Sequence, residues 1–145
     1  MKQLITIAAV VLVGCSNGTR MADVLVPPSD ENLITDSIVE TAVRKSLKKP
    51  EGELTEADLG NVIELILTDT QITDEGLKEM AKLQRLETLQ LSYTRITDAG
   101  IKEVAKSQQL GSLFLTDTQI TDAGIKDVAK LQKLKMLRIR GTRVT

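Results

Sequence analysis

The chain has 145 residues, with 19 basic and 20 acidic side chains and a formal net charge of −1. This length allows one small domain, and the balanced charge gives no reason to expect nucleic acid as a general partner. The chain has no histidine and a single cysteine, Cys15, so it offers neither an intrachain disulfide nor a Cys/His metal site. We therefore expect that the protein binds no metal and no other cofactor, and that it is not an enzyme.

Residues 1–14 begin with a cationic Lys2, which is followed by an apolar run from Leu4 to Val13. A bilayer-spanning helix needs about 20 residues, so this run fits the apolar part of a secretory signal peptide better. The letters LVGC that end at Cys15 resemble the lipobox of bacterial lipoproteins. The alternative is a buried helix with a chance cysteine.

The lipoprotein resemblance implies that Cys15 becomes the mature N-terminus and carries acyl chains such as palmitate. Two or more chains would hold the protein on a membrane without a spanning helix. Ser16, rather than Asp, follows the cysteine, and the resemblance then favours the outer over the inner membrane of the cell envelope.

Residues 15–35 show no sustained period and contain Pro27-Pro28, which predicts a tether between the lipid and the domain. A terminus without a spacing role is the alternative. Residues 36–61 predict a helical N-terminal cap: apolar residues recur at helical intervals up to Pro50, and Thr55 with Asp58 predicts a second short helix. Such a cap would cover the apolar edge of the first repeat, although a partner-binding helix fits the same pattern.

Residues 62–145 contain about three and a half units with a 24-residue period, in which Leu67, Leu91, Leu115 and Ile139 occupy equivalent positions. Repeats of 20 to 29 residues with an L-x-L core are typical of leucine-rich-repeat solenoids. The phrase ITDxGL resembles the cysteine-containing subtype of these repeats, in the ribonuclease-inhibitor-like superfamily. The fold class expected is α/β, with short parallel strands on a concave face and helices on a convex face.

Residues at equivalent positions of successive repeats form columns that are expected to build the scaffold. The alternating leucines predict an inward column on each strand, followed by a buried isoleucine column. Thr70 and its equivalents should satisfy backbone groups of the turn. The Thr-Asp pairs at residues 73–74, 97–98 and 121–122 are expected to cap the helices, and apolar residues from Leu77 to Leu86 should form one inward helix face.

Partner binding is expected on the concave sheet, for a protein or peptide ligand. The outward charge changes from acidic in the first repeat to basic in the last. The only aromatic residues, Tyr93 and Phe114, are predicted to face outward on adjacent strands, and aromatic side chains dominate many interfaces. The complete predicted site is Tyr93, Phe114, Gln90, Asp117, Arg138 and Arg140. Phe114 could instead merely cover its neighbours on the sheet.

The sequence stops after a fourth strand, at Thr145. An edge left open there would invite pairing with another chain, so a homo-oligomer is possible. A truncated gene product or a fraying end would account for the same stop. The function expected is a membrane-anchored binding module of the bacterial cell envelope, and the alternative is a structural envelope lipoprotein that self-associates through the open C-terminal edge.

Overall fold

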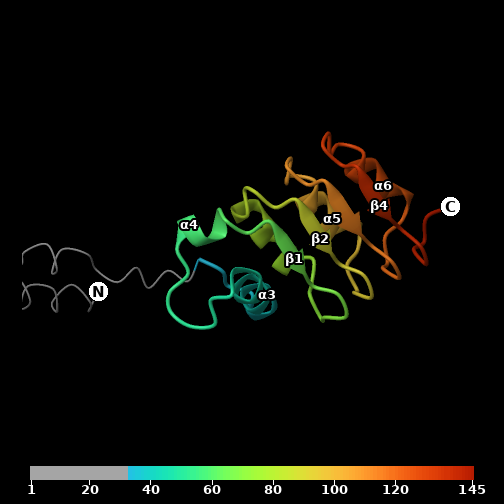
Figure 1. Ribbon diagram of the computed structural model, residues 1–145. Helices are drawn as coiled ribbons and strands as arrows, with labels where there is room; N and C mark the ends of the chain where they lie inside the picture. Colours follow the sequence, from blue (N-terminus) through green and yellow to red (C-terminus); the bar gives the residue numbers. More distant parts are fainter. Residues whose placement is uncertain (1–32) are drawn as a thin grey trace, which may run out of the picture. The chain divides into compact units, whose positions relative to one another are not determined.

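The computed structural model describes residues 33–145, in which short strands alternate with short helices (Figure 1). The elements in chain order are α3 (Ser37–Leu47), α4 (Glu56–Leu59), β1 (Glu64–Ile66), the 3-10 helix η1 (Gly76–Lys82), β2 (Thr88–Gln90), α5 (Asp98–Val104), β3 (Ser112–Phe114), α6 (Asp122–Val128) and β4 (Met136–Arg138). The predicted signal peptide, the anchor Cys15 and most of the predicted tether lie outside the described residues.

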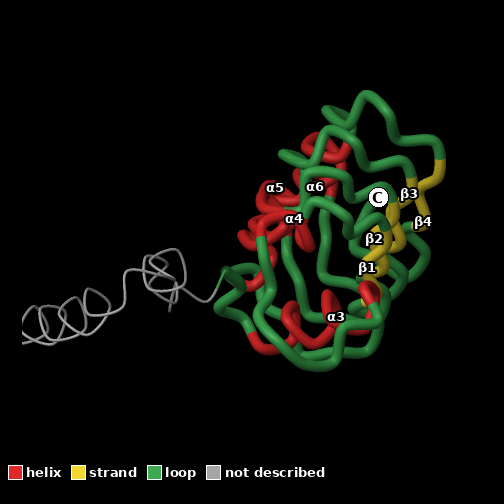
Figure 2. Tube along the Cα trace, turned by 60° about the vertical axis from the view of Figure 1, so that its left-hand side comes forward, coloured by secondary structure: helices red, strands yellow, loops and turns green. Residues whose placement is uncertain are grey.

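The four strands form one parallel sheet in the order β1-β2-β3-β4. Residues one repeat apart pair directly, so that Leu65 pairs with Leu89 and Leu89 with Leu113. Figure 2 shows the strands stacked along one side of this unit, with α5 and α6 on the other side. The predicted α/β repeat solenoid is therefore confirmed.

The core lies between the sheet and the helices. Leu65, Leu89 and Leu113 are fully buried, because alternate residues of a strand face opposite sides of the sheet. The predicted isoleucine column is buried at Ile72, Ile96 and Ile120, whereas Val144, its predicted fourth member, is half-buried. Leu137 departs from the prediction: it pairs with Leu113 but is 36% exposed, since β4 is the last strand of the sheet in the described part of the chain.

The helices on the convex side are shorter than predicted. The sequence predicts one apolar helix face that extends from Leu77 to Leu86. In the described repeats the helices are η1, a 3-10 helix, and the seven-residue α-helices α5 and α6. Leu83 and Leu86 are buried but follow η1, and Ala81 is exposed, so its predicted inward position is wrong. A 24-residue unit must also return the chain to the next strand, which leaves room for about two helical turns.

The predicted N-terminal helix is present as α3, which contacts both β1 and η1. The Asp36 carboxylate accepts hydrogen bonds from the N–H groups of Ile38 and Val39 and so caps its first turn. The Thr55–Asp58 pair forms a full capping box at α4. Apolar side chains of this region, such as Val39 and Val43, continue the core of the repeats.

Residues 33–35, which the sequence predicted as the end of the tether, pack onto this fold instead. Ile34 is fully buried, and the N–H and hydroxyl of Thr35 donate to Glu79 Oε1 at 3.2 and 2.6 Å. A Cβ added at Gly76 would clash with the Asp36 carboxylate, just as one at Gly100 would clash with that of Asp74. The letters ITD at 34–36 thus repeat the phrase at 72–74 and begin the stack one unit earlier than predicted.

The aspartates of the Thr-Asp pairs do not cap their own helices, which corrects the prediction. Thr97 alone caps α5, by accepting a hydrogen bond from the Ala99 N–H. The Asp98 carboxylate instead reaches the next repeat, where the N–H and hydroxyl of Thr121 donate to it at 2.8 and 2.5 Å. Asp74 receives the same two bonds from Thr97, and Asp122 receives them from Thr145. We call this series the Asp–Thr ladder.

The threonine column of the turns is structural, as predicted, but each hydroxyl acts within its own repeat. Thr94 donates to the carbonyl oxygen of Leu91 at 2.6 Å, and Thr118 donates to that of Leu115 at 2.9 Å. Thr70 and Thr142 make the same bond. The column therefore closes the turn after each strand, whereas the side chains of the ladder join one repeat to the next.

Acid should weaken the Asp–Thr ladder. Burial opposes ionisation of Asp98, but hydrogen bonds from Thr121 and from the Gly124 N–H outweigh burial and lower its pKa below the ordinary value of 3.8. The stabilisation is therefore complete above the unfolded pKa and is lost as pH falls through the folded one. We expect Asp98→Asn to lower the free energy of unfolding by about 1 kcal/mol at pH 7, and by progressively less below pH 3.8.

Urea unfolding followed by circular dichroism between pH 7 and strongly acidic pH measures this difference. Asp69→Asn is the matched control, because Asp69 is an exposed turn residue with a positive φ that asparagine also tolerates. An equal destabilisation by Asp98→Asn at every pH would contradict the role of its charge.

Candidate functional site

The candidate site is the face of the sheet that points away from the helices. We call it the sheet face. It carries the first and third residues of each strand, which are Glu64, Ile66, Thr88, Gln90, Ser112, Phe114, Met136 and Arg138. Scaffold columns repeat the same residue types, whereas these positions change character from strand to strand.

The third residues of the strands form a row across the sheet, in which Gln90 pairs with Phe114 and Phe114 with Arg138. At one end of the row Gln90 Nε2 donates to Glu64 Oε1 at 3.1 Å. At the other end the Arg138 guanidinium lies over the Phe114 ring, 5.6 Å from its centroid. Of the predicted site residues, the structure thus brings Gln90, Phe114 and Arg138 together.

Tyr93 and Asp117 lie elsewhere, in the turns that follow β2 and β3. The backbone ladder continues past the strands, because the Tyr93 N–H donates to Thr116 O at 2.8 Å and the Asp117 N–H to Arg140 O at 2.8 Å. Both residues therefore occupy the edge of the sheet where the strands end. The prediction that Tyr93 and Phe114 face outward on adjacent strands is wrong for Tyr93, since β2 ends at Gln90.

The turn residues share a left-handed backbone. Asp69, Tyr93 and Asp117 have φ of 57°, 59° and 53°, and Gly141 follows in the fourth repeat with 70°. Aspartate and glycine adopt this conformation readily, but a tyrosine does so at a cost of about 1 kcal/mol or more. The Tyr93 side chain is also 58% exposed, so burial of its ring does not repay that cost within the described residues.

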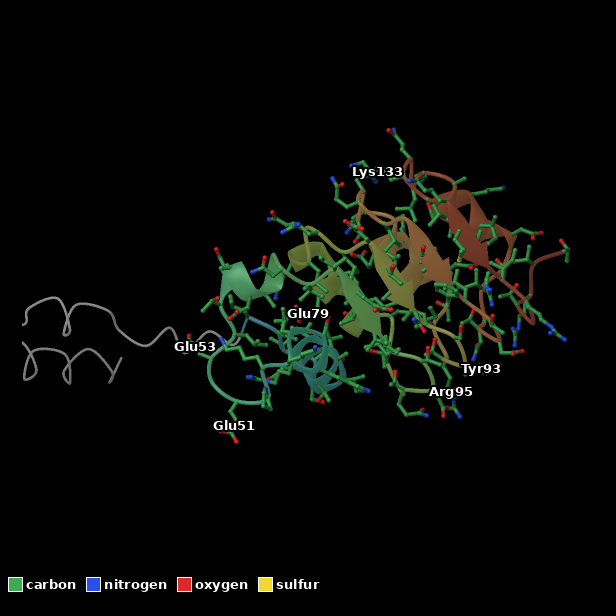
Figure 3. The ribbon with its side chains drawn as sticks, in the orientation of Figure 1. Glu51, Glu53, Glu79, Tyr93, Arg95 and Lys133 are labelled. Carbon is green, nitrogen blue, oxygen red and sulfur yellow. The ribbon has the colours of Figure 1, made fainter. Side chains whose placement is uncertain are left out.

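Arginines gather beside this edge. Arg138, Arg140 and Arg143 are all exposed and follow one another along and just after β4. Arg95 occupies the position equivalent to Arg143 two repeats earlier, and Figure 3 shows it on the same edge as Tyr93, with Lys133 at the opposite edge. Sequence reasoning missed Arg95, although a second arginine 48 residues later in the same column could have indicated it.

A shallow groove of about 250 Å³ lies at the other end of the sheet face. It is lined by Ala42, Lys45 and Ser46 of α3 together with Glu64 and Ile66 of β1. Ser46 Oγ donates to the Glu64 carbonyl oxygen at 2.6 Å and fixes the helix against the strand. Ile66 is 48% exposed and supplies an apolar side chain to this groove.

The described residues lack two other kinds of site. In residues 33–145 no group of three His, Cys, Asp or Glu side chains is placed to hold a metal ion. No helix in this range has the length and apolar character needed to cross a membrane. The carboxylates with a lowered pKa all have structural partners: Asp98 and Asp122 serve the Asp–Thr ladder, Asp58 completes the capping box of α4, and Glu79 accepts hydrogen bonds from Thr35.

Comparison with known proteins gives the fold its name. Residues 61–81 and 82–105 match the family described as Leucine Rich repeat. The structure resembles that of an internalin (inlF) from Listeria monocytogenes, with a TM-score of 0.63 and 21% identity over 78% of this chain and 32% of that one. The fold is a leucine-rich-repeat solenoid. An internalin C2 (inlC2) from the same organism matches with a TM-score of 0.46 and 22% identity, over 78% of this chain and 68% of that one.

No match was found among curated proteins. The chain spans about a third of the length of the first internalin, 32%, and at this identity the likeness shows the fold alone. Leucine-rich-repeat proteins in general are protein-interaction modules, which use the extended surface created by stacking their repeats. In such proteins the side chains on that surface, rather than the solenoid itself, define the partner.

The strain at Tyr93 can be measured in this leucine-rich-repeat solenoid. We expect Tyr93→Asn to raise the free energy of unfolding by about 1 kcal/mol, because asparagine tolerates the left-handed backbone. Urea unfolding checks this. Gln119→Asn, at an exposed turn residue without a positive φ, is the control and should stay within about 0.5 kcal/mol of wild type. A loss of stability in Tyr93→Asn would mean that the ring contributes to packing.

Proposed function

We propose that this protein is a lipid-anchored binding module of the bacterial cell envelope that holds a protein or peptide partner on its sheet face. It is not an enzyme. The observation that carries the proposal is the set of aromatic and arginine side chains on the sheet face and its edge: exposed Tyr93 in a strained turn, and half-buried Phe114 beneath exposed Arg138.

Aromatic and arginine side chains are the residue types that contribute most to binding energy at interfaces. Tyr93 is held in an unfavourable conformation and its side chain is 58% exposed. Backbone strain of this kind is typical of binding sites, where the stability lost by the free protein is recovered in the complex. Tyr93 therefore supports a binding function more strongly than its exposure alone would.

The chemistry of the chain supports binding rather than catalysis. Histidine is absent from the sequence. Asp74, Asp98 and Asp122, the repeated carboxylates, each accept two hydrogen bonds from the following repeat. Carboxylates engaged in this way maintain the stacking of the repeats and are poor candidates for general acids or bases.

The membrane anchor rests on the sequence of residues 1–15. A cationic start, a short apolar run and a cysteine after a glycine occur in the order typical of lipoprotein signals. Acylated Cys15 would attach the repeats to a membrane, and Ser16 favours the outer membrane. The residues from Ser16 to Asn32 would then connect the lipid to the folded repeats.

A pull-down tests the binding function. We expect the full-length protein to capture its partner from an envelope extract of the native host, and Tyr93→Ala with Phe114→Ala to reduce recovery at least about tenfold, since truncating a binding anchor costs about 2 kcal/mol or more. Gln109→Ala with Lys133→Ala is the control, because Lys133 lies at the opposite edge of the sheet (Figure 3) and its Nζ donates a hydrogen bond to Gln109 Oε1.

Undiminished recovery by the aromatic double variant would show that the sheet face is not the site. Self-association through β4, where Met136 is 46% and Leu137 is 36% exposed, would then be the better candidate. That alternative predicts association that depends on concentration in sedimentation experiments. A protein that stays monomeric at high concentration counts against it.

Metabolic labelling with an alkyne palmitate analogue tests the anchor. We expect Cys15→Ser to abolish labelling and to leave the leader uncleaved, because the sulfur is the proposed site of acylation. Ser16→Ala should keep the label, since it leaves the cysteine in place. Labelling that persists in Cys15→Ser would exclude this residue as the anchor.

A further inference from the structure

The sheet face is electrostatically uneven. Arg138 of β4 is exposed, as are Arg140 and Arg143 just after this strand, and we call these three residues the basic cluster. None of them takes part in the ion pairs formed within residues 33–145. The whole chain carries a net charge of −1, so this local concentration of unpaired arginine is not a consequence of a generally basic composition.

Phe114 prepares one of these arginines for an anionic ligand. The Arg138 guanidinium is 5.6 Å from the ring centroid, a distance at which the cation is attracted to the face of the ring. This attraction does not use up the N–H donors of the guanidinium, which can bind a carboxylate. Arg138 is thus positioned before any ligand arrives.

The β1 end of the sheet face carries carboxylates. Glu64 of β1 and Asp69 of the turn after it are exposed there, and Glu64 lines the groove beside Ile66 together with Lys45 of α3. Three strand spacings of about 4.8 Å separate β1 from β4, which gives about 14 Å between the groove and the arginines. An extended chain of about four residues covers this distance, at about 3.3 Å per residue.

We propose that the partner presents an extended acidic segment to the sheet face. Its carboxylates lie over Arg138 and Arg140, and an apolar side chain about four residues away enters the groove beside Ile66. This inference rests on the proposed binding function and adds the chemical class and the direction of the ligand. Glu64 and Asp69 set the direction, because they repel carboxylates from the β1 end.

Arginines also bind anionic lipid headgroups, so a membrane surface is the alternative ligand. The arrangement of the sheet face favours the peptide. A membrane surface is uniformly negative across about 14 Å, so it would bring phosphates over Glu64 and Asp69 together with the basic cluster. Only a ligand whose charge varies along its length matches both ends of the sheet face.

Asp117 lies at the edge of the basic cluster. Its N–H donates to the carbonyl oxygen of Arg140, and a Cβ added at Gly141 would clash with its carboxylate. The carboxylate is therefore directed at the backbone of the turn after β4 and is not ion-paired with Arg140. Its charge should limit how far the ligand's carboxylates extend past Arg140.

Fluorescence anisotropy with synthetic peptides tests the inference. The probe is a fluorescein-labelled heptapeptide, Leu-Ser-Gly-Ser-Glu-Glu-Glu, titrated with the full-length protein in a non-ionic detergent. We expect it to bind at least about tenfold more tightly than the same peptide with three lysines, and more weakly as salt rises. Moving the leucine next to the glutamates should also weaken binding.

Charge reversal identifies the residues responsible. Arg138→Glu with Arg140→Glu should weaken binding of the acidic peptide at least about tenfold, because like charges then face each other. Arg85→Glu with Lys133→Glu makes the same change of charge at exposed residues before β2 and β4 and should leave affinity within about twofold of wild type. Circular dichroism confirms that each variant is folded.

Three results would overturn the inference: equal binding of the lysine peptide, no effect of the reversal at Arg138 and Arg140, or displacement of the peptide by dihexanoyl-phosphatidylserine at equal concentration. The pull-down separates this failure from that of the proposed function. A captured partner that depends on Phe114 and Tyr93 but not on Arg138 and Arg140 would keep the binding function and exclude the acidic segment. A partner that depends on neither pair would exclude both.

Discussion

The hydrogen bonds from Thr121 to Asp98, and their equivalents in the neighbouring repeats, are the interaction on which the rest of this solenoid depends. Each Asp carboxylate accepts hydrogen bonds from the N–H and the hydroxyl of the threonine in the next repeat, and Thr97 and Thr121 also cap α5 and α6. One side chain pair therefore fixes both the start of a helix and its distance from the preceding unit. Gly124, three residues after Thr121, is required because a Cβ there would lie 2.5 Å from the Asp98 carboxylate of the preceding repeat.

The ladder explains why the sheet face can vary. Contact between repeats is secured by the Asp–Thr pairs on the convex side, the leucines of the core and the backbone bonds of the strands. None of these interactions uses the first or third side chain of a strand. Phe114 and Arg138 can therefore occupy positions where other repeats carry Ile66 and Gln90, at little cost to the fold.

The sequence was sufficient to predict what the 24-residue period controls. The period identifies Leu65, Leu89 and Leu113 as one column, and burial of that column requires parallel strands. It cannot tell which neighbour a polar side chain reaches, so it predicts that Asp98 caps its own helix. It also contains no information about backbone dihedral angles, which is why it places Tyr93 on a strand. The 24-residue period does not identify the ITD phrase at 34–36 as part of a repeat, because the longer helix α3 follows it and increases the spacing to the next phrase.

The position of Tyr93 connects the scaffold to its proposed use. The turn after each strand is held in a left-handed conformation by the threonine beside it, and Asp69, Asp117 and Gly141 accept that conformation without difficulty. A tyrosine there lowers the stability of the free protein but fixes an aromatic ring at the edge of the sheet face, close in sequence to Arg95. The fold thus supplies a rigid position whose geometry is set by the repeat, and a residue poorly suited to that geometry is best explained by a contact made outside the chain.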